Sequence, residues 1–366
     1  MNIIVLGAGM MGRALGFDLS KYSNFKKITI ADRDKKSIQS CKNFLKNQDI
    51  NYEIIDLEKI TDIKKQFQKN DVAISAVPYK YNYVLAKAAV ETKTHFLDLG
   101  GNNDIVNKEK SLFNNAYKNN VTIIFDCGLA PGLTSVITKD LVEQIDSIEY
   151  VKIRVGGLPI NPKPPLNYQI VFSPNGLINE YVEDAIVLDH GKIIEKKSMT
   201  EIEEVIFPEP FGKMEAFVTS GGCSTLPYTY RDKIDYLDYK TVRYPGHCKE
   251  FKPLLSLEPR EELIEYLQKN LPSNEKDAVL LKLMSTGKKN GKKVRIEYTM
   301  INYYDEKNNI TSMMRTTSYP TSVVAQLIEK GEINKYGVFG CEEVVPCNPF
   351  FKELVKRNIK IEKEIK

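Results

Sequence analysis

Residues 2–32 read NIIVLGAGMMGRALGFDLSKYSNFKKITIAD, and this stretch decides the fold. A short apolar run precedes Gly7-Ala8-Gly9-Met10-Met11-Gly12, a helix-compatible segment follows, and a second apolar run ends at Asp32. G-x-G-x-x-G between a strand and a helix is typical of a dinucleotide-binding unit. Glycine allows the turn at position 7, the approach of a pyrophosphate at position 9 and close helix packing at position 12. The stretch therefore predicts a strand, a phosphate-binding loop, a helix and a second strand.

Asp32 bears on which dinucleotide binds. A carboxylate at the end of the second strand accepts hydrogen bonds from the ribose hydroxyls of NAD and repels the 2′-phosphate of NADP. Arg33 lies next to it and could cover a 2′-phosphate or stack beside the adenine. We predict NAD, with NADP as the less favoured cofactor.

Alternating strand and helix patterns continue to about residue 125. We expect helices at 35–46, 58–69, 81–91 and 107–119, and strands at 52–55, 71–76, 95–99 and 121–125. With the two strands of the first unit, this makes a six-stranded, doubly wound parallel Rossmann sheet. Loops rich in small and polar residues follow the last three strands, beginning at Val77-Pro78, Asp98 and Asp126. Because ligands bind at the carboxyl ends of such strands, we expect these loops to frame the nicotinamide.

From about residue 148 the pattern changes to short β-prone runs separated by proline and glycine. We predict a second α+β domain with a mixed, mainly antiparallel sheet, in which 294–304 pairs with 310–317 as a hairpin. Helical spacing returns at 320–329, and 352–366 is expected to be a surface helix. The expected divisions are a Rossmann domain at 1–130, a substrate-binding and oligomerisation domain at 131–319, and a helical segment at 320–366 that packs back on the Rossmann domain.

Composition excludes several classes of protein. The 366 residues carry 52 basic and 48 acidic side chains, so the net charge of +4 does not predict a nucleic-acid or membrane partner. No apolar run approaches the roughly 20 residues that span a bilayer. Six separate cysteines and three histidines do not predict a metal site, and reduced thiols are typical of a cytoplasmic protein. Exposed sheet edges and aromatic faces predict a homo-oligomer.

A set of motifs spread over nearly the whole chain resembles the saccharopine dehydrogenase family, most closely its lysine 6-dehydrogenase branch. The motifs are Val5-Leu6-Gly7-Ala8-Gly9, Ser75-Ala76-Val77-Pro78-Tyr79, Leu97-Asp98-Leu99-Gly100-Gly101, Gly128-Leu129-Ala130-Pro131-Gly132, Gly156-Gly157-Leu158-Pro159, Tyr168 with Phe172-Ser173-Pro174, Thr219-Ser220-Gly221-Gly222, and Lys240-Thr241-Val242-Arg243-Tyr244-Pro245-Gly246-His247. Saccharopine-type members carry an acid where this chain has Ala130, and a tyrosine where it has Gly-Gly-Asn after the fifth strand. These departures favour the lysine branch.

The resemblance implies NAD-dependent oxidative deamination of the ε-amino group of L-lysine. The products would be ammonium and 2-aminoadipate 6-semialdehyde, which cyclises to piperideine-6-carboxylate. One alternative is a saccharopine or carboxynorspermidine dehydrogenase or reductase that uses NADP(H). Another, of a different class, is a non-catalytic NAD(H)-binding redox sensor.

The residues suggest candidates for each step. His247 has the intrinsic pKa of a general base, while Asp126 and Asp98 could attract an ammonium group. Tyr168 could donate to a carboxylate, and the fork of Arg243 suits the α-carboxylate of the substrate. Each of these residues has a structural alternative: a bonded core histidine or tyrosine, an Asx turn, or a buried ion pair.

The predicted site is therefore as follows. We assign His247, Asp126 and Tyr168 to catalysis, and Thr241, Arg243, Asp98 and Gly101 to substrate binding, Thr241 through the family's Thr-x-Arg position. We assign Gly7, Gly9, Met10, Met11, Gly12, Asp32, Arg33, Asp56, Ala76, Val77, Pro78, Gly128, Ala130 and Pro131 to the cofactor.

Overall fold

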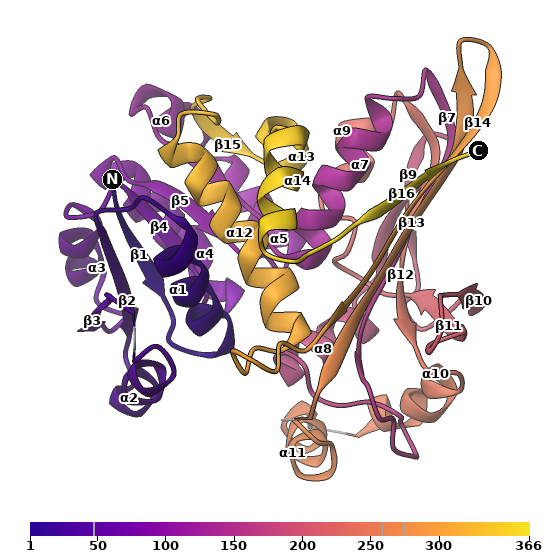
Figure 1. Cartoon of the computed structure of the whole chain (residues 1–366), viewed down its shortest axis with the longest axis horizontal. Coiled ribbons are helices and arrows are strands. Elements are labelled where there is room, and N and C mark those ends of the chain that lie inside the picture. The colour runs from indigo at the N-terminus through magenta and orange to yellow at the C-terminus, as the bar shows by residue number, and fades with distance from the viewer. Residues whose placement is uncertain (47, 258, 274) are drawn as a thin grey trace. The chain divides into compact units, whose positions relative to one another are not determined.

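The computed structural model describes residues 1–46, 48–257, 259–273 and 275–366 (Figure 1). They form two compact units. Unit 1 comprises Met1–Val136 and Met314–Asn358, and unit 2 comprises Ile137–Met313 and Ile359–Lys366. The units divide at 136/137 and 313/314, whereas the sequence predicted divisions at 130/131 and 319/320. The last residues, Ile359–Lys366, belong to unit 2 and not to the Rossmann unit.

Unit 1 contains a parallel sheet of seven strands in its described part, in the order β15-β6-β5-β4-β1-β2-β3. The strands are β1 (Asn2–Leu6), β2 (Lys27–Asp32), β3 (Asn51–Ile54), β4 (Val72–Ser75), β5 (His95–Asp98), β6 (Thr122–Ile124) and β15 (Gly337–Phe339). The central strands are continuous apolar runs because both of their faces are buried. The doubly wound sheet confirms the predicted Rossmann fold, and β15 adds a strand that the sequence pattern did not predict.

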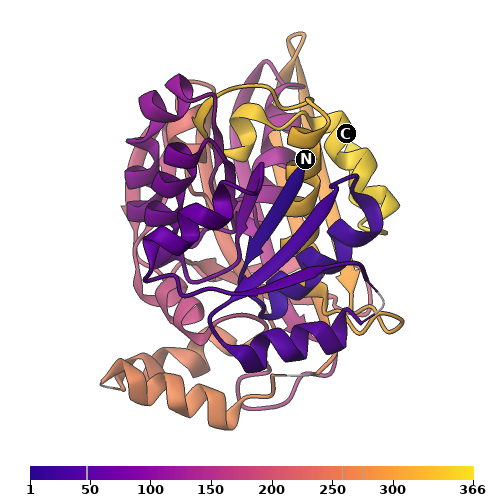
Figure 2. The same cartoon turned by 90° about the vertical axis from the view of Figure 1, so that its left-hand side faces the viewer.

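Helices cover both faces of this sheet (Figures 1 and 2). They are α1 (Met10–Tyr22), α2 (Lys35–Phe44), α3 (Ile60–Phe67), η1 (Tyr79–Tyr81), α4 (Asn82–Thr92), α5 (Asn103–Lys110), α6 (Phe113–Lys118), η2 (Leu129–Leu133), α12 (Ser312–Glu329), α13 (Cys341–Val344) and α14 (Cys347–Lys356). Helix α12 is tied to the Rossmann core, since Ser318 donates to the Met11 carbonyl at 3.1 Å and Thr321 donates to the Cys127 carbonyl at 2.7 Å. Strand order reverses between β1 and β4, which marks the carboxyl edge as the ligand-binding edge.

Unit 2 is built on a mixed sheet in which β12 and β7 pair in parallel and the other described pairs are antiparallel. Its main path is β10-β11-β12-β7-β13-β14-β16, and β8 and β9 extend it beside β12. The strands are β7 (Ser147–Pro159), β8 (Ala185–Asp189), β9 (Lys192–Lys196), β10 (Glu203–Ile206), β11 (Lys213–Val218), β12 (Ile234–Arg243), β13 (Asp277–Lys289), β14 (Lys292–Tyr303) and β16 (Glu362–Ile365). This confirms the predicted mixed, mainly antiparallel second domain.

The helices of unit 2 are shorter and lie between the strands in sequence. They are α7 (Thr134–Val142), which begins at the end of unit 1, α8 (Pro174–Val182), α9 (Leu226–Tyr230), α10 (His247–Phe251), η3 (Lys252–Ser256) and α11 (Arg260–Asn270). None of the described helices is long and apolar enough to cross a membrane.

Two local predictions were wrong. Residues 310–317 do not pair with 294–304: β14 pairs with β13, and α12 begins at Ser312. The Asp277 carboxylate accepts the backbone N–H groups of Ser312 at 2.6 Å and Met313 at 2.9 Å, so a residue 35 positions away starts this helix. The predicted surface helix at 352–366 ends at Lys356, Asn358 adopts a φ of +57°, and Glu362–Ile365 pairs with β14 as an edge strand.

Candidate active site

The loop after β1 has the features of a phosphate cradle. Gly7 has a φ of +107°, and a Cβ atom at Gly12 would lie 1.8 Å from the Gly7 carbonyl oxygen, so neither position accepts a side chain. At Gly9, no atom lies within 4 Å of the Cβ position, which leaves the backbone open to a ligand. None of the described side chains caps the first N–H groups of α1, which starts with Met10 and Met11. Open backbone and free helix donors fit a pyrophosphate.

The carboxylate of Asp32 is held in place by the backbone. Its Oδ2 accepts from the Ala8 N–H at 2.8 Å, and its Oδ1 accepts from the Asp34 N–H at 2.9 Å. The side chain therefore lies beside the glycine loop at the end of β2, where the ribose of NAD is expected.

Two arginines lie near Asp32 and the glycine loop. Arg33 is exposed, and Arg13, which the motif analysis did not select, donates to the Ala8 carbonyl at 3.3 Å and to Ser40 Oγ at 2.9 Å. Asp56 lies in the turn after β3, where it accepts the Glu58 N–H at 3.1 Å. Two acidic and two basic side chains therefore lie near the predicted adenosine edge.

The other predicted cofactor residues form the loops after β4 and β6. Ala76 and Val77 are half-buried and lie beside Gly7, because a Cβ atom at Gly7 would be 2.5 Å from the Ala76 carbonyl oxygen. Pro78 is exposed and directly precedes η1. After β6, Gly128 precedes η2, which contains Ala130 and Pro131. Both loops lie at the carboxyl edge of the sheet, on the same edge as the glycine loop.

Three carboxyl groups are buried at this edge of unit 1. Asp98 ends β5 and is 1% exposed, Asp126 follows β6 and is 4% exposed, and Glu109 on α5 is 0% exposed. Burial and the charges of the neighbouring carboxylates raise the pKa values of Asp98 and Glu109. The Gly100 N–H donates to Asp98 Oδ1 at 2.7 Å, and Gly101 keeps a φ of +127° beside the Tyr79 ring. Asp98 and Glu109 are therefore shifted toward their protonated forms.

In unit 2, a buried arginine without a carboxylate partner is the central feature. Arg243 ends β12 and is 2% exposed. Its Nε donates to the Tyr181 hydroxyl at 2.9 Å and its Nη1 to the Val242 carbonyl at 2.9 Å, while the Tyr168 ring centroid lies 4.7 Å from the guanidinium carbon. Among the described residues of unit 2, no carboxylate oxygen lies within 4.0 Å of this guanidinium.

Arg154 provides the contrast. This residue on β7 is 0% exposed, and its two terminal nitrogens donate to both carboxylate oxygens of Asp238 at 2.8 and 3.0 Å, while its Nε contacts Glu203. It pairs with Lys240 in the register, so it lies on the opposite face of the sheet from Arg243. Arg154 therefore belongs to a structural ion pair, and the described part of the chain gives Arg243 no equivalent carboxylate.

His247 begins α10 and is joined to Arg243 through a chain of hydrogen bonds. A carbonyl oxygen only accepts, so His247 Nδ1 donates to the Leu166 carbonyl at 2.8 Å. Nε2 of the neutral ring then accepts from the Tyr181 hydroxyl at 3.0 Å, and that hydroxyl accepts from Arg243. Burial, and then the charge of Arg243, lower the pKa of His247 to about 3. The ring is therefore neutral, 1% exposed, and engaged at both nitrogens.

The predicted Thr241 lies on the same face of β12 as Arg243, two residues earlier. Its hydroxyl lies 2.7 Å from that of Thr219, so the two motifs that carry these threonines meet in unit 2. Tyr239 continues the row, and a Cβ at Gly222 would lie 2.3 Å from its ring, which explains the glycine there. A row of polar side chains thus runs along one face of the sheet.

Glu180 is a further residue of this cluster that the motifs did not select. It is half-buried near the end of α8, next to Tyr181, and its charge acts on Arg243 and Tyr168. Only the three-dimensional packing of α8 on β12 brings it there.

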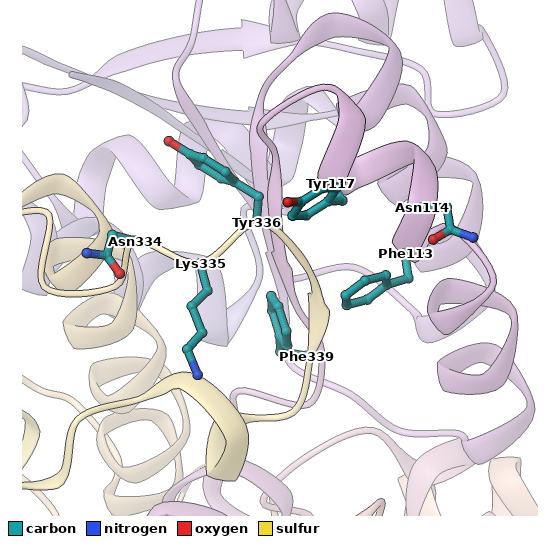
Figure 3. A pocket seen from close by; sticks show the side chains of 7 residues that line it. All are labelled: Phe113, Asn114, Tyr117, Asn334, Lys335, Tyr336 and Phe339. Atoms are coloured by element: carbon teal, nitrogen blue, oxygen red, sulfur yellow. The ribbon is translucent and has the colours of Figure 1, made fainter.

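A cavity of about 470 Å³ lies between α6 and β15 in unit 1 (Figure 3). It is lined by Phe113, Asn114, Tyr117, Asn334, Lys335, Tyr336 and Phe339. None of the predicted site residues lines it, so it is not part of the candidate active site.

Comparison with known proteins agrees with this arrangement. Residues 3–124 match the saccharopine dehydrogenase NADP binding domain, and residues 128–359 match the saccharopine dehydrogenase C-terminal domain. The chain is 22% identical to the saccharopine dehydrogenase [NADP(+), L-glutamate-forming] of Schizosaccharomyces pombe over 454 residues, which cover 100% of this chain and 99% of that protein. It is 24% identical over 274 residues to the mitochondrial alpha-aminoadipic semialdehyde synthase of Rattus norvegicus, covering 70% of this chain but 28% of that protein's length.

Solved structures show the same fold. Apo saccharopine dehydrogenase (L-Glu forming) from Saccharomyces cerevisiae superposes with a TM-score of 0.82 at 18% identity, covering 100% of this chain and 99% of that one. Homospermidine synthase from Legionella pneumophila, solved in complex with NAD, has a TM-score of 0.70 at 14% identity and covers 100% of this chain and 91% of that one. With both family domains matched in order along the chain, this protein belongs to the saccharopine dehydrogenase family.

Proposed function

We propose that this oxidoreductase uses NAD to oxidise the ε-amino group of L-lysine. The observation that carries the proposal is Arg243, a buried guanidinium with no carboxylate partner among the described residues. A buried charge is costly unless it is paired, so such a residue is suited to an anionic ligand. A single fork suits the single carboxylate of lysine, whereas saccharopine carries three carboxylates.

The residues of unit 1 that would hold the dinucleotide are the glycine loop, the first N–H groups of α1, and Asp32. When bound, the nicotinamide accepts the hydride that leaves C6 of lysine. The substrate loses an ε-ammonium proton and a hydride, and water replaces the nitrogen at C6. The products are 2-aminoadipate 6-semialdehyde and ammonium.

The roles of the three predicted catalytic residues can now be separated. His247 is suited to positioning rather than to proton transfer, because both ring nitrogens are bonded and its pKa is lowered to about 3. Tyr168 is also suited to positioning, because burial raises its pKa to about 12 and its ring covers the Arg243 guanidinium. We retain Asp126 as the proposed proton acceptor, with Asp98 beside it.

Thr241 and Arg243 would bind the amino-acid end of the substrate. Asp98 would form a hydrogen bond with the ε-amine, and Gly101 would leave room for it. These assignments follow the resemblance to the lysine 6-dehydrogenase branch and the geometry of each unit.

A second candidate is a saccharopine dehydrogenase or reductase that uses NADP(H). The names of the curated relatives favour it, and Arg13 beside the glycine loop is a further positive residue near the expected ribose. Asp32 favours NAD because its carboxylate repels a 2′-phosphate.

Absorbance at 340 nm separates these functions. Purified protein is mixed with each of four pairs: NAD or NADP with L-lysine or saccharopine. We expect reduction of NAD that depends on lysine. A signal from saccharopine with NADP alone would overturn the lysine assignment, and no signal in any pair would favour a non-catalytic NAD(H)-binding redox sensor.

A further inference from the structure

Glu180 is an acidic residue of the cluster around Arg243 that the proposed mechanism does not use. It lies in α8, directly before Tyr181, whose hydroxyl accepts from Arg243. Its backbone carbonyl accepts the Ser220 N–H at 3.0 Å, and the Ser220 hydroxyl donates to the carbonyl of Asn179 at 3.3 Å. The end of α8 is therefore fixed to the loop that follows β11.

The carboxylate of Glu180 has no hydrogen-bond partner among the described residues. The side chain is half-buried, so the carboxylate has lost part of its hydration without gaining a protein donor. Two other carboxylates of unit 2 that are at least partly buried do have donors: Glu203 contacts Arg154, and Asp238 accepts from it. A partly buried carboxylate without a donor is suited to a cationic ligand for the same reason that Arg243 is suited to an anion.

Glu180 and Arg243 are near enough for each charge to act on the other. Burial raises the pKa of Glu180 to about 7, while Arg243 acts in the opposite direction. Burial raises the pKa values of Tyr168, Tyr181 and Tyr239, and the charge of Glu180 adds to the shift of each. The opposite charges interact across the cluster without forming an ion pair within 4.0 Å.

We propose that Glu180 binds the α-ammonium group of the substrate while Arg243 binds its α-carboxylate. The two groups of an α-amino acid sit on one carbon atom, so their protein partners must be neighbours of opposite charge that do not neutralise each other directly. The inference rests on the proposed function and adds to it that the substrate carries a free α-ammonium group. It makes Glu180 a residue that selects α-amino acids over ω-amino acids, while Arg243 selects them over diamines.

A substrate series tests the pairing. L-Lysine carries both groups, 6-aminohexanoate lacks the α-ammonium group, and cadaverine lacks the carboxylate. Steady-state kinetics are measured for the wild type and for Glu180→Gln, which keeps the size of the side chain but removes its charge. Glu195→Gln on the exposed face of β9 is the matched control for loss of one negative charge.

For Glu180→Gln, we expect the KM for L-lysine to rise about 10- to 100-fold, as for loss of one hydrogen bond to a charged group. The KM for 6-aminohexanoate should stay within about twofold of the wild type, because this substrate has no group for Glu180 to bind. A structural role would change both values together. Equal changes for the two substrates, or no change for lysine, would overturn the assignment.

Failure of the proposed function can be distinguished from failure of the Glu180 assignment, because the wild type would then turn over none of these amines. In that case, calorimetric titration of L-lysine and 6-aminohexanoate in the presence of NADH replaces kinetics. Selective loss of lysine binding in Glu180→Gln would still support the ammonium site. Equal loss for both compounds, or no binding of either to the wild type, would refute it.

Discussion

Replacing Arg243 by methionine, beside the same change at Arg154, distinguishes a ligand-binding arginine from a structural one. Both residues are buried in neighbouring strands of one sheet, and both changes replace a long charged side chain by an apolar one of similar length. The two variants differ in what they leave behind. Arg154→Met leaves the buried Asp238 carboxylate without its guanidinium, whereas Arg243→Met leaves no carboxylate unpaired.

The expected magnitudes follow from these contacts. Breaking a buried pair costs about 3–5 kcal/mol, so Arg154→Met should lower the free energy of unfolding by that amount. Arg243→Met loses hydrogen bonds to Tyr181 and Val242, each worth about 1 kcal/mol, and removes an unpaired buried charge. Its net cost should be no more than about 2 kcal/mol. Two charge-assisted bonds to the substrate carboxylate are worth about 3–6 kcal/mol, so the KM for lysine should rise roughly 10²- to 10⁴-fold.

Urea unfolding followed by far-UV circular dichroism measures stability, because the chain contains no tryptophan to report by fluorescence. Initial rates at 340 nm measure the KM for lysine. Arg243→Met should fold and bind substrate poorly, while Arg154→Met should be less stable with a nearly normal KM in the folded fraction. Equal destabilisation by both changes, with the KM of Arg243→Met unaltered, would refute a ligand-binding role for Arg243.

Three further predictions concern unit 1. Gly9→Ala should keep the melting temperature and lose most NADH binding, while Gly12→Ala should fail to fold stably because its Cβ would lie 1.8 Å from the Gly7 carbonyl oxygen; melting curves with and without NADH separate the two, and equal melting temperatures would contradict this. Asp32→Ala should weaken NADH binding about 10-fold and reduce discrimination against NADPH, and fluorescence titrations that show unchanged discrimination would count against the ribose contact. Glu109→Gln should be more stable than the wild type at pH 9. The pKa of Glu109 in the folded protein is raised above its ordinary 4.5, so the folded state keeps a proton that the unfolded state loses, and the free energy of unfolding of the wild type falls by up to about 1.4 kcal/mol per pH unit as pH rises above 4.5. The same dependence of unfolding free energy on pH in the variant would refute the assignment.

Much of unit 1 could be predicted from the sequence because its signals are local. The glycine spacing, the apolar runs and Asp32 all lie within one βαβ unit, and the structure has the strand, loop and helix where they were expected. Strand β15 was missed because three residues, Gly337–Phe339, carry no strand pattern of their own and are recruited by pairing with β6. The predicted start of helix α12 was too late, because the residue that caps its true start, Asp277, is far away in sequence.

The site was predicted less completely. Arg243, Thr241 and His247 lie in one motif, so they could be selected together, but the burial that makes His247 neutral depends on Tyr181 and Leu166 from other segments. Glu109 and Glu180 belong to no motif. They could not be selected from the sequence, because what distinguishes them is the carboxylates and the arginine that the fold brings near them. The homo-oligomer and the cytoplasmic location stay predictions.

The most direct test of lysine 6-oxidation uses L-lysine carrying two deuterium atoms at C6. After incubation with the protein and NAD, the NADH is isolated and its mass is measured. Hydride transfer from C6 predicts NADH one mass unit heavier than unlabelled NADH, with deuterium at C4 of the nicotinamide. Formation of unlabelled NADH would place the oxidation at another carbon of lysine and contradict the proposed reaction.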